Sequence, residues 1–454
     1  MKNHLSLDDL LLLANEEFIN EIYRILLNRQ PDVGGRAHYL HLLRTGTSKT
    51  EVIAQIRKSP EGIMHSVHIE GIDGIVGTHS KKANSLFRSV KKIFDGKSRP
   101  QRSLAQTATN VERIEKNHIS PTREIRTTRS VQSNIVCVIP FYNGASFIDR
   151  ALESVFSQTV RADEVIVVND GSRSEERDYV HSLKKKYPII VIDKQNGGQG
   201  SARNAGVAAS QSEYICMLDQ DDFYLPRHNE ILLNNVPRDD PTFGWIYGDL
   251  VEAEGDGSFM RTSMVKEHSS HPKRSFIDLI GNDMFVLPSA SLISRKAFDS
   301  IGGFDEQFTG YEDDDLFLRL FRKGWSNVFV DTSVTVWCIH SESTSYSVRM
   351  SRSRFKYFAK LAVQYPDDPE KVRYYFRDLL VPRFGPLIIA DALKANECRS
   401  KDKEEIYEIL EKYAAMVRAN KGISRKAKKK LDKIVYYLTK WPNYGAQMAR
   451  RLMR

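Results

Sequence analysis

The feature that most constrains this chain is a regular alternation of short apolar runs and helical patterns between residues 134 and 222. The apolar runs are rich in β-branched residues, which predicts buried strands. The segments between them repeat apolar residues at helical spacing. Strands that alternate with helices form βαβ units, so the sequence predicts an α/β fold with a mostly parallel sheet flanked by helices. The expected strands lie in IVCVIPFY, DEVIVVNDGS, PIIVIDK and EYICMLDQDD, and the expected helices in SFIDRALESVFSQT, SEERDYVHSLKKKY and SARNAGVAAS.

Polar residues gather where these strands end. The first strand ends in Pro140-Phe-Tyr-Asn143, the second ends in Asn169-Asp-Gly-Ser172, and a glycine-rich stretch over 196–206 follows the third. Ligands of open α/β sheets bind at the carboxyl ends of the strands, so we expect the site here. The glycine-rich stretch lacks the Gly-Lys-Ser/Thr of a P-loop and the G-x-G-x-x-G spacing. Its Arg203 can bind a phosphate or pair with a neighbouring acid.

Three carboxylates follow the fourth strand, at Asp219, Asp221 and Asp222. Such a group is repulsive unless a positive charge neutralises it. Carboxylate oxygens suit Mg²⁺ or Mn²⁺, and such a metal is commonly shared with substrate phosphates. A solvated acidic turn is the alternative interpretation, because D-x-D is a short motif.

Seven pieces of sequence occur in a characteristic order, namely IPFYN, VVNDGS, NGGQGSARNAG, LDQDD, GGFDE, GYEDDDLFLRL and the later His340. This ordered set, which runs from about Ile135 to about Tyr346, resembles the family 2 glycosyltransferases of GT-A fold. The resemblance implies a GT-A type nucleotide-diphospho-sugar transferase fold. It also implies transfer of a hexosyl or N-acetylhexosaminyl group from a nucleotide sugar, with a UDP-sugar as the first expectation. The acceptor that it implies is a hydroxyl of a bacterial surface polysaccharide or a lipid-linked glycan.

The resemblance also implies roles for individual residues on the donor side. Pro140, Tyr142 and Asp170 match donor-binding positions, and the last two would hold the base and ribose of the nucleotide. Arg203 matches a position near the base or the diphosphate. Asp219 would reach the ribose, or the metal through water.

For the metal, the resemblance implies Mn²⁺ or Mg²⁺ ligated directly by Asp221, with Asp222 as an acidic neighbour of structural role. His340 matches a histidine that approaches the metal or the diphosphate in some members. A hydrogen-bonded histidine after a strand is its alternative interpretation.

The family pattern Glu-Asp singles out Asp313 as the general base. An acceptor hydroxyl needs a positioned base to take its proton during attack, and a free Asp, with a pKa of about 3.9, is ionised at neutral pH. One base and one direct displacement invert the anomeric carbon, whereas a retaining route needs a second carboxylate as nucleophile. Because three aspartates follow one another, the match to the family pattern can shift by one position. Asp314 is therefore the alternative base. Within the predicted helix, Asp315 and Arg319 can pair, and Leu316, Leu320 and Phe321 are expected to pack inward.

The flanking segments divide the chain into residues 1–65 (a small helical domain), 66–133 (a basic linker), 134–346 (the catalytic domain) and 347–454 (a helical C-terminal region). Ser6 and the pair Ser48 and Glu51 are helix-start signals in the first segment. Its sequence resembles a small helical domain of unknown role found in bacterial surface and glycan-related proteins. The expected core positions are Phe18, Ile22, Ile25, Leu26, Val52, Ile53 and Ile56 in this domain, and Tyr407, Leu410, Tyr413, Ala414, Ile434, Tyr437, Leu438 and Trp441 in the C-terminal region.

The formal net charge of +9 is unevenly distributed. Residues 81–133 carry +9 and residues 418–454 carry +11, which leaves −11 on the rest of the chain. This argues against a nucleic-acid groove through the core, and segment 81–133 lacks the interleaved aromatic residues of a single-strand binder. The basic tail either lies on an anionic membrane or packs on the catalytic domain.

Four separated cysteines without a C-x-x-C pair favour a reducing compartment, and no apolar run approaches the ~18 residues of a membrane span. The N-terminus is a poor signal peptide, so we expect a cytoplasmic protein, peripheral to the inner face of the cell membrane if the tail binds lipid. Two other functions stay open, namely a non-catalytic nucleotide-sugar or glycan-binding protein of the same fold and a sugar-phosphate nucleotidyltransferase. The latter would more typically place a glycine-rich loop after the first strand.

Overall fold

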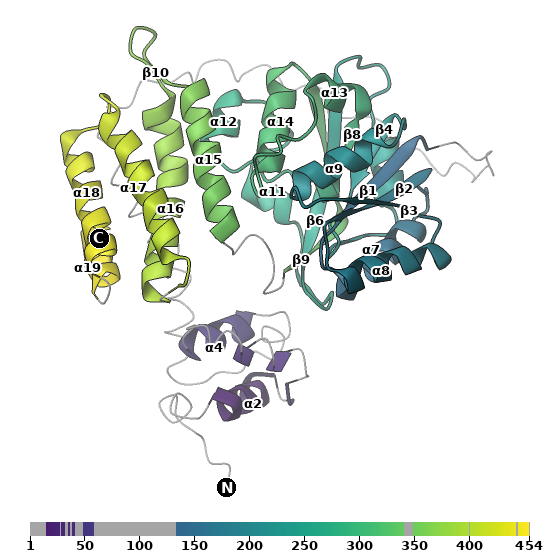
Figure 1. The fold of residues 1–454 in the computed structure, drawn as a ribbon, viewed down its shortest axis with the longest axis horizontal. Coiled ribbons are helices and arrows are strands. Elements are labelled where there is room, and N and C mark those ends of the chain that lie inside the picture. Colours follow the sequence, from purple (N-terminus) through teal and green to yellow (C-terminus); the bar gives the residue numbers. More distant parts are fainter. Residues whose placement is uncertain are drawn as a thin grey trace, which may run out of the picture.

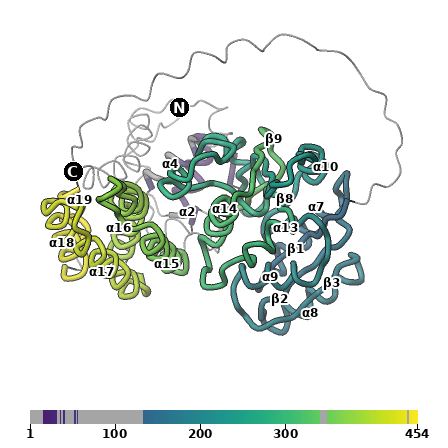
Figure 2. The backbone as a smooth tube through the Cα atoms, turned by 90° about the horizontal axis from the view of Figure 1, so that it is seen from above, coloured from purple at the N-terminus to yellow at the C-terminus, as the bar shows by residue number. Residues whose placement is uncertain are grey.

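The computed structural model describes residues 15–27, 29–31, 35–36, 39–40, 49–58, 133–339, 348–398, 400–441 and 444–453. Outside these residues lie the expected helix after Ser6, the Ser48 cap, residues 66–132 of the linker and His340. Figures 1 and 2 show a sheet with its covering helices beside an array of C-terminal helices, with α14 (Glu312–Arg322) between them.

The strands of the main sheet run in the order β3-β2-β1-β4-β8-β6-β9-β5, and β7 pairs with β6. Their bounds are β1 Ile135–Phe141, β2 Glu164–Asp170, β3 Ile190–Lys194, β4 Tyr214–Met217, β5 Phe223–Tyr224, β6 Phe243–Glu254, β7 Phe259–Arg261, β8 Ser291–Ser294 and β9 Ser326–Ile339. The strands β3, β2, β1 and β4 are parallel neighbours, as their alternation with helices predicts. The second half is mixed, because β8 runs antiparallel to both β4 and β6 while β6 and β9 are parallel. The α/β fold class is confirmed.

The helices of the sheet region include the three that the sequence predicts between the first four strands. Their bounds are α7 Ala145–Phe156, α8 Ser174–Ser182, α9 Gln199–Ala208, α10 His228–Asn234, α11 Met264–His268, α12 Phe276–Gly281 and α13 Arg295–Ser300, with 3-10 turns at Leu183–Lys185 and Pro288–Ala290. Helix α9 packs on β1 and β2. Gly206 makes that approach possible, because a Cβ there would lie 2.4 Å from Val138 Cγ1.

Strand β1 lies in the centre of the sheet and is buried along its whole length. It contains Pro140, a residue that cannot donate to a strand ladder. The pairing of β1 with β4 ends at Val138, whereas its pairing with β2 continues to Phe141. Pro140 therefore lies where β1 has lost one neighbour, and the strand ends beside the acidic turn that follows β4.

The C-terminal helices share one continuous hydrophobic core with the sheet region. They are α15 Val348–Gln364, the π-helical turn Phe376–Leu380, α16 Val381–Glu397, α17 Lys403–Ala419, α18 Arg425–Lys440 and α19 Gly445–Met453, with a small hairpin of β10 Asp367–Asp368 and β11 Arg373–Tyr374. The predicted face of α17 is buried at Tyr407, Leu410, Tyr413 and Ala414. In α18, Ile434 and Leu438 are buried, Tyr437 is partly buried and Trp441, just after the helix, is exposed. Packing on the rest of the protein thus accounts for the inner face of the tail.

In the N-terminal segment, α2 (Asn15–Leu27) and α4 (Lys49–Lys58) pack around a separate hydrophobic cluster. The predicted core residues lie in it, with Ile25 partly buried at its edge. None of the described helices is both long and apolar enough to cross a membrane. All four cysteines are free thiols.

Candidate active site

The carboxylate of Asp170, at the end of β2, organises the glycine-rich loop. It accepts hydrogen bonds from the backbone N–H groups of Gly197 and Gly198, at 2.9 and 2.7 Å, and from Lys194 Nζ at 2.7 Å. Gly171 follows at φ +74°, and a Cβ there would lie 2.7 Å from the Asn196 nitrogen, so this turn requires glycine. The second strand is thereby fastened to the loop that begins α9.

The end of β1 is tied to the acidic turn by Gln220. Its amide accepts from the Tyr142 N–H at 2.8 Å and donates to the Tyr142 carbonyl at 3.2 Å. The Tyr142 side chain itself is 40% exposed, which leaves its ring available to a ligand. Asn143 joins the next loop through Ser172, whose hydroxyl accepts from the Asn143 N–H at 3.0 Å. The ends of three strands are therefore held together by polar contacts.

A buried arginine connects the glycine-rich loop, the acidic turn and α14. Arg203 is 2% exposed and donates to Asp219 Oδ1 at 2.6 Å and to Glu312 Oε1 at 3.0 Å. Gln199 also donates to Asp219 Oδ1, at 2.6 Å. Burial raises the pKa of Glu312, although the charge of Arg203 opposes it. Of the two roles left open for Arg203, the structure shows the ion pair with neighbouring acids.

The acidic turn also contacts helix α7 and strand β9. Arg150 donates to the Asp221 carbonyl at 2.8 Å, and the buried Asp222 accepts from the Cys338 N–H at 2.9 Å. Burial and the charges of Asp221 and Asp219 raise the pKa of Asp222 well above its ordinary value. The turn thus brings three carboxyl groups close together, with Asp222 buried in the protein.

No group of three or more His, Cys, Asp or Glu that could hold a metal occurs in the part of the chain that the structure describes. Asp219 and Asp221 offer hard carboxylate oxygens at one turn. That set fits Mg²⁺ or Mn²⁺ bound by one or two carboxylates, with the remaining ligands from substrate phosphates and water.

The first turn of α14 contains four consecutive acids, and three of them form ion pairs. Glu312 pairs with Arg203, Asp314 pairs with Arg383 of α16, and Asp315 pairs with Arg319 and with Lys360 of α15. Asp313 forms no ion pair with any residue that the structure describes. Its Oδ1 accepts from the Asp314 N–H at 2.8 Å.

Electrostatics distinguish Asp313 from an ordinary surface carboxylate. Protein surrounds it on most sides although part of the side chain reaches the surface. Burial and the charges of Glu312 and Asp314 raise the pKa of Asp313 well above its usual range. A carboxylate of raised pKa is a stronger proton acceptor once it is ionised.

The backbone before α14 is strained at Tyr311, which has φ +63°. This conformation is unfavourable for a bulky residue and persists only where neighbours hold it. The Tyr311 ring stacks on Tyr357 at 5.5 Å between centroids, and its hydroxyl lies 3.2 Å from Arg354 Nε. Helix α15 therefore helps to fix the direction in which α14 begins.

Two families of known proteins match this part of the chain. Residues 136–302 match glycosyl transferase family 2, and residues 251–374 match glycosyltransferase-like family 2. Residues 136–374 of the chain are those of a family 2 glycosyltransferase. Residues 11–65 match a domain of unknown function, DUF4214, in agreement with the expected small helical domain.

Relatives that match this region include an uncharacterized glycosyltransferase of Rickettsia conorii, 30% identical over 50% of this chain and 37% of that protein. The chondroitin synthase of Pasteurella multocida is 29% identical over 41% of this chain and 18% of that protein. The chain thus spans well under half the length of both relatives. The structure of S. aureus TarS 1–349 in complex with UDP aligns at 16% identity and a TM-score of 0.44, over 70% of this chain and 90% of that chain.

Several residues of the candidate site could not be predicted from the sequence. Lys194 lies directly beside Asp170 in the register of β2 and β3, so correct strand alignment would have revealed that pair. The partners Gln199 and Gln220 and the bridging Arg150 give no comparable signal, because their contacts depend on how separate loops fold together. Near the start of β9, Trp325 donates its indole N–H to Ser300 Oγ at 2.9 Å.

Proposed function

We propose that residues 134–346 form the catalytic domain of a metal-dependent, inverting glycosyltransferase. It moves a hexosyl or N-acetylhexosaminyl group from a nucleotide sugar, with UDP as the expected nucleotide, to an acceptor hydroxyl. The observation that carries this proposal is the first turn of α14. Three of its four acids are neutralised by buried or half-buried cations, and Asp313 has a backbone contact but no ion pair among the residues that the structure describes.

Asp313 is the general base in this proposal. It takes the proton of the acceptor hydroxyl while that oxygen attacks the anomeric carbon, and the bond to the diphosphate breaks with its electron pair on the leaving oxygen. The pairing of Asp314 with Arg383 supports Asp313 over Asp314, since a carboxylate in a buried ion pair is a poor acceptor for an incoming hydroxyl. Attack opposite to the leaving group inverts the anomeric carbon.

The donor lies, in this proposal, over the ends of β1, β2 and β4. Tyr142 and Asp170 contact the base and ribose beside Pro140, and the loop that Asp170 organises presents N–H groups to the nucleotide. Arg203 holds Asp219 in place, and Asp219 and Asp221 bind the metal and ribose. A bound Mg²⁺ or Mn²⁺ offsets the negative charge of the departing nucleoside diphosphate. His340 belongs to the same proposal as a metal or diphosphate contact.

The acceptor in this proposal is a growing bacterial polysaccharide or a lipid-linked glycan. The likeness to a protein named chondroitin synthase supports a glycan acceptor. The test of the whole function is a panel of nucleotide sugars with Mg²⁺ or Mn²⁺, measured by release of the nucleoside diphosphate. We expect one donor to be turned over only when a divalent metal is present. Turnover that is unchanged after chelation of metal would contradict the metal role.

The C-terminal tail adds peripheral membrane binding to the proposal. The outer side of α18 and the segment after it expose aromatic rings at Tyr436, Trp441 and Tyr444 among many lysines and arginines. Aromatic and cationic side chains together suit the interface of an anionic bilayer at the inner face of a cell membrane. Co-sedimentation with phosphatidylglycerol vesicles should be salt-sensitive and weaker in the Trp441→Ser, Tyr444→Ser double variant. Absence of salt-sensitive recovery with these anionic vesicles would contradict the membrane role.

A further inference from the structure

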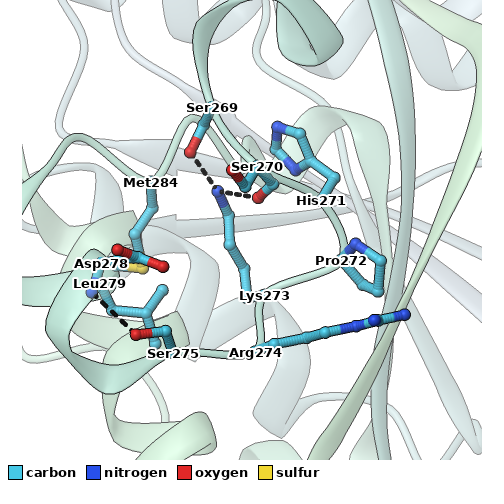
Figure 3. A pocket seen from close by; sticks show the side chains of 10 residues that line it. All are labelled: Ser269, Ser270, His271, Pro272, Lys273, Arg274, Ser275, Asp278, Leu279 and Met284. Carbon is cyan, nitrogen blue, oxygen red and sulfur yellow. Dashed lines mark hydrogen bonds between the residues drawn. The ribbon is translucent and has the colours of Figure 1, made fainter. Parts of the chain in front are cut away.

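A cavity of about 270 Å³ lies beside α12, which packs against α14 and against the π-helical turn before α16. Residues 269–275, together with Asp278, Leu279 and Met284, line it. Figure 3 shows Lys273 extending toward Ser269 and Ser270, with Asp278 and Met284 nearby. None of the residues that line it belongs to the donor site described above.

Lys273 is the distinctive group of this cavity because it is only 6% exposed. Its ammonium donates to Ser269 Oγ at 2.7 Å and to the Ser270 carbonyl at 3.1 Å. Its backbone is fixed by Asn327, which accepts from the Lys273 N–H at 2.8 Å and donates to its carbonyl at 2.9 Å. Among the residues that the structure describes, it has no ion-pair partner. A buried ammonium of this kind is costly unless an anion compensates it.

The other charges around the cavity leave it positive. Arg274 is a second cation in its lining, and Asp278 is the one acid there among the described residues. Burial lowers the pKa of Lys273 to about 8, against the opposing charges of Asp314, Asp283 and Asp278, so the ammonium form dominates at neutral pH. Burial lowers the pKa of His271 to about 4, which makes that ring neutral.

The cavity is connected to the first turn of α14 through Arg383. One guanidinium nitrogen of Arg383 donates to the carbonyl of Leu279, which lines the cavity, at 3.0 Å, and another pairs with Asp314. Asp314 is the neighbour of Asp313, and its charge is one of those that act on Lys273. The neighbour of Asp313 and the lining of the cavity are therefore bridged by one side chain.

We propose that this cavity binds an anionic group of the acceptor, a carboxylate or a phosphate, with Lys273 as its counter-ion. The proposal rests on the proposed function and narrows its acceptor to an acidic glycan or a phosphate-bearing glycan. The volume lies at the small end of ligand sites, which suits one charged substituent or a single sugar. Both sources present an oxyanion to the same ammonium, and the Ser269 hydroxyl beside it can donate to a further oxygen.

The test is titration of the full chain with glucuronate, inorganic phosphate and neutral glucose, followed by ligand-observed NMR. We expect one of the anions to bind at least tenfold more tightly than glucose, and Lys273→Met to remove that preference. Tighter binding of glucuronate assigns a carboxylate, and tighter binding of phosphate assigns a phosphate group. Lys266→Met is the matched control, because Lys266 lies in the same segment, exposed and paired with Asp331. Equal binding of glucose, or a preference that survives in Lys273→Met, would overturn the proposal.

A second pair of variants keeps the test decisive if Lys273→Met does not fold. Ser269→Ala removes the hydroxyl that holds the ammonium and should weaken anion binding several-fold. Ser270→Ala should leave it unchanged, since only the Ser270 backbone contacts Lys273. Equal anion affinity of these two variants would count against the site.

Hydrolysis of the donor without acceptor separates this proposal from the proposed function. Release of nucleoside diphosphate under those conditions should be the same for Lys273→Met and the unmodified chain, while anion binding is lost. If the unmodified chain shows no donor turnover, the proposed function fails, and the anion titration still decides the cavity by itself.

Discussion

The first turn of α14 forms ion pairs with two regions of the molecule, the sheet region and the C-terminal helices, and these ion pairs connect it to different sites. On the sheet side, Arg203 binds Glu312 and also Asp219, so its contact reaches the donor site. On the helical side, Arg383 binds Asp314 and the carbonyl of Leu279, and its contact reaches the cavity lined by Lys273. The same helix turn is thus linked to two sites by two buried arginines. Asp313 lies between the two supported acids.

The largest effect is expected from Asp313→Asn, which alters the group between the two supports. Loss of a general base typically costs 10²–10⁴-fold in rate, and we expect transfer to fall by about that factor while donor affinity stays within about twofold. Steady-state kinetics and nucleotide titration would measure the two quantities. Asp314→Asn is the comparison variant, and a greater loss of turnover there than in Asp313→Asn would reassign the base.

On the donor side alone, Asp221→Ala should weaken metal-dependent binding of nucleotide. We expect affinity for the nucleoside diphosphate in Mn²⁺ to fall by tenfold or more, and to approach the affinity measured in EDTA. Calorimetric titration with and without Mn²⁺ gives both values. Glu213→Ala, which changes an exposed acid at the opposite end of β4, serves as control. A metal effect that persists unchanged in Asp221→Ala would contradict the metal role of that residue.

A matched pair of variants, Arg203→Met and Arg383→Met, directly compares the ion pairs that these two arginines form with the first turn of α14. Each leaves a buried carboxylate without its cation, which typically costs 3–5 kcal/mol of unfolding free energy. Only Arg203→Met should also weaken donor binding, because only Arg203 contacts Asp219. Denaturant unfolding and nucleotide titration separate the effects. Equal donor affinity in the two variants would show that the supports are equivalent.

The smallest effect is expected in the pH dependence of the unfolding free energy, and it comes from a histidine in the sheet region. His228 is fully buried, its Nδ1 lies 3.2 Å from the Val334 carbonyl, and burial lowers its pKa to about 3. The unfolded chain takes up this proton near pH 6.5 and the folded chain does not, so the unfolding free energy decreases as the pH falls below 6.5. The loss between pH 6.5 and pH 5 should be about 1.6 kcal/mol. His228→Asn, measured by denaturant unfolding at both pH values, should lose less, and an identical loss would exclude His228 as its source.

Prediction from the sequence succeeded where structure follows from local patterns. Runs rich in β-branched residues located the first four strands, and the helical spacing of apolar residues located the helices between them. Both predictions work because each such segment buries a face that its own sequence defines. The pair of Asp315 with Arg319 was predictable for the same reason, since residues four apart share a helix face. The mixed second half of the sheet was not, because β6, β8 and β9 are joined by long connections whose return direction no local pattern specifies.

For the candidate site, the sequence determined which chemical groups stand at the ends of the strands and at the start of α14. Only the tertiary structure decided how each of them is used. Four adjacent acids, Glu312 to Asp315, look alike in sequence and differ in the fold, because partners for three of them come from residues 203, 319, 360 and 383. The ion pairs with Arg203, Lys360 and Arg383 join residues 45 to 109 positions apart in the chain, and no spacing rule reaches so far. The sequence determined that each of these residues carries a carboxylate. Tertiary packing determined which carboxylates are held in ion pairs.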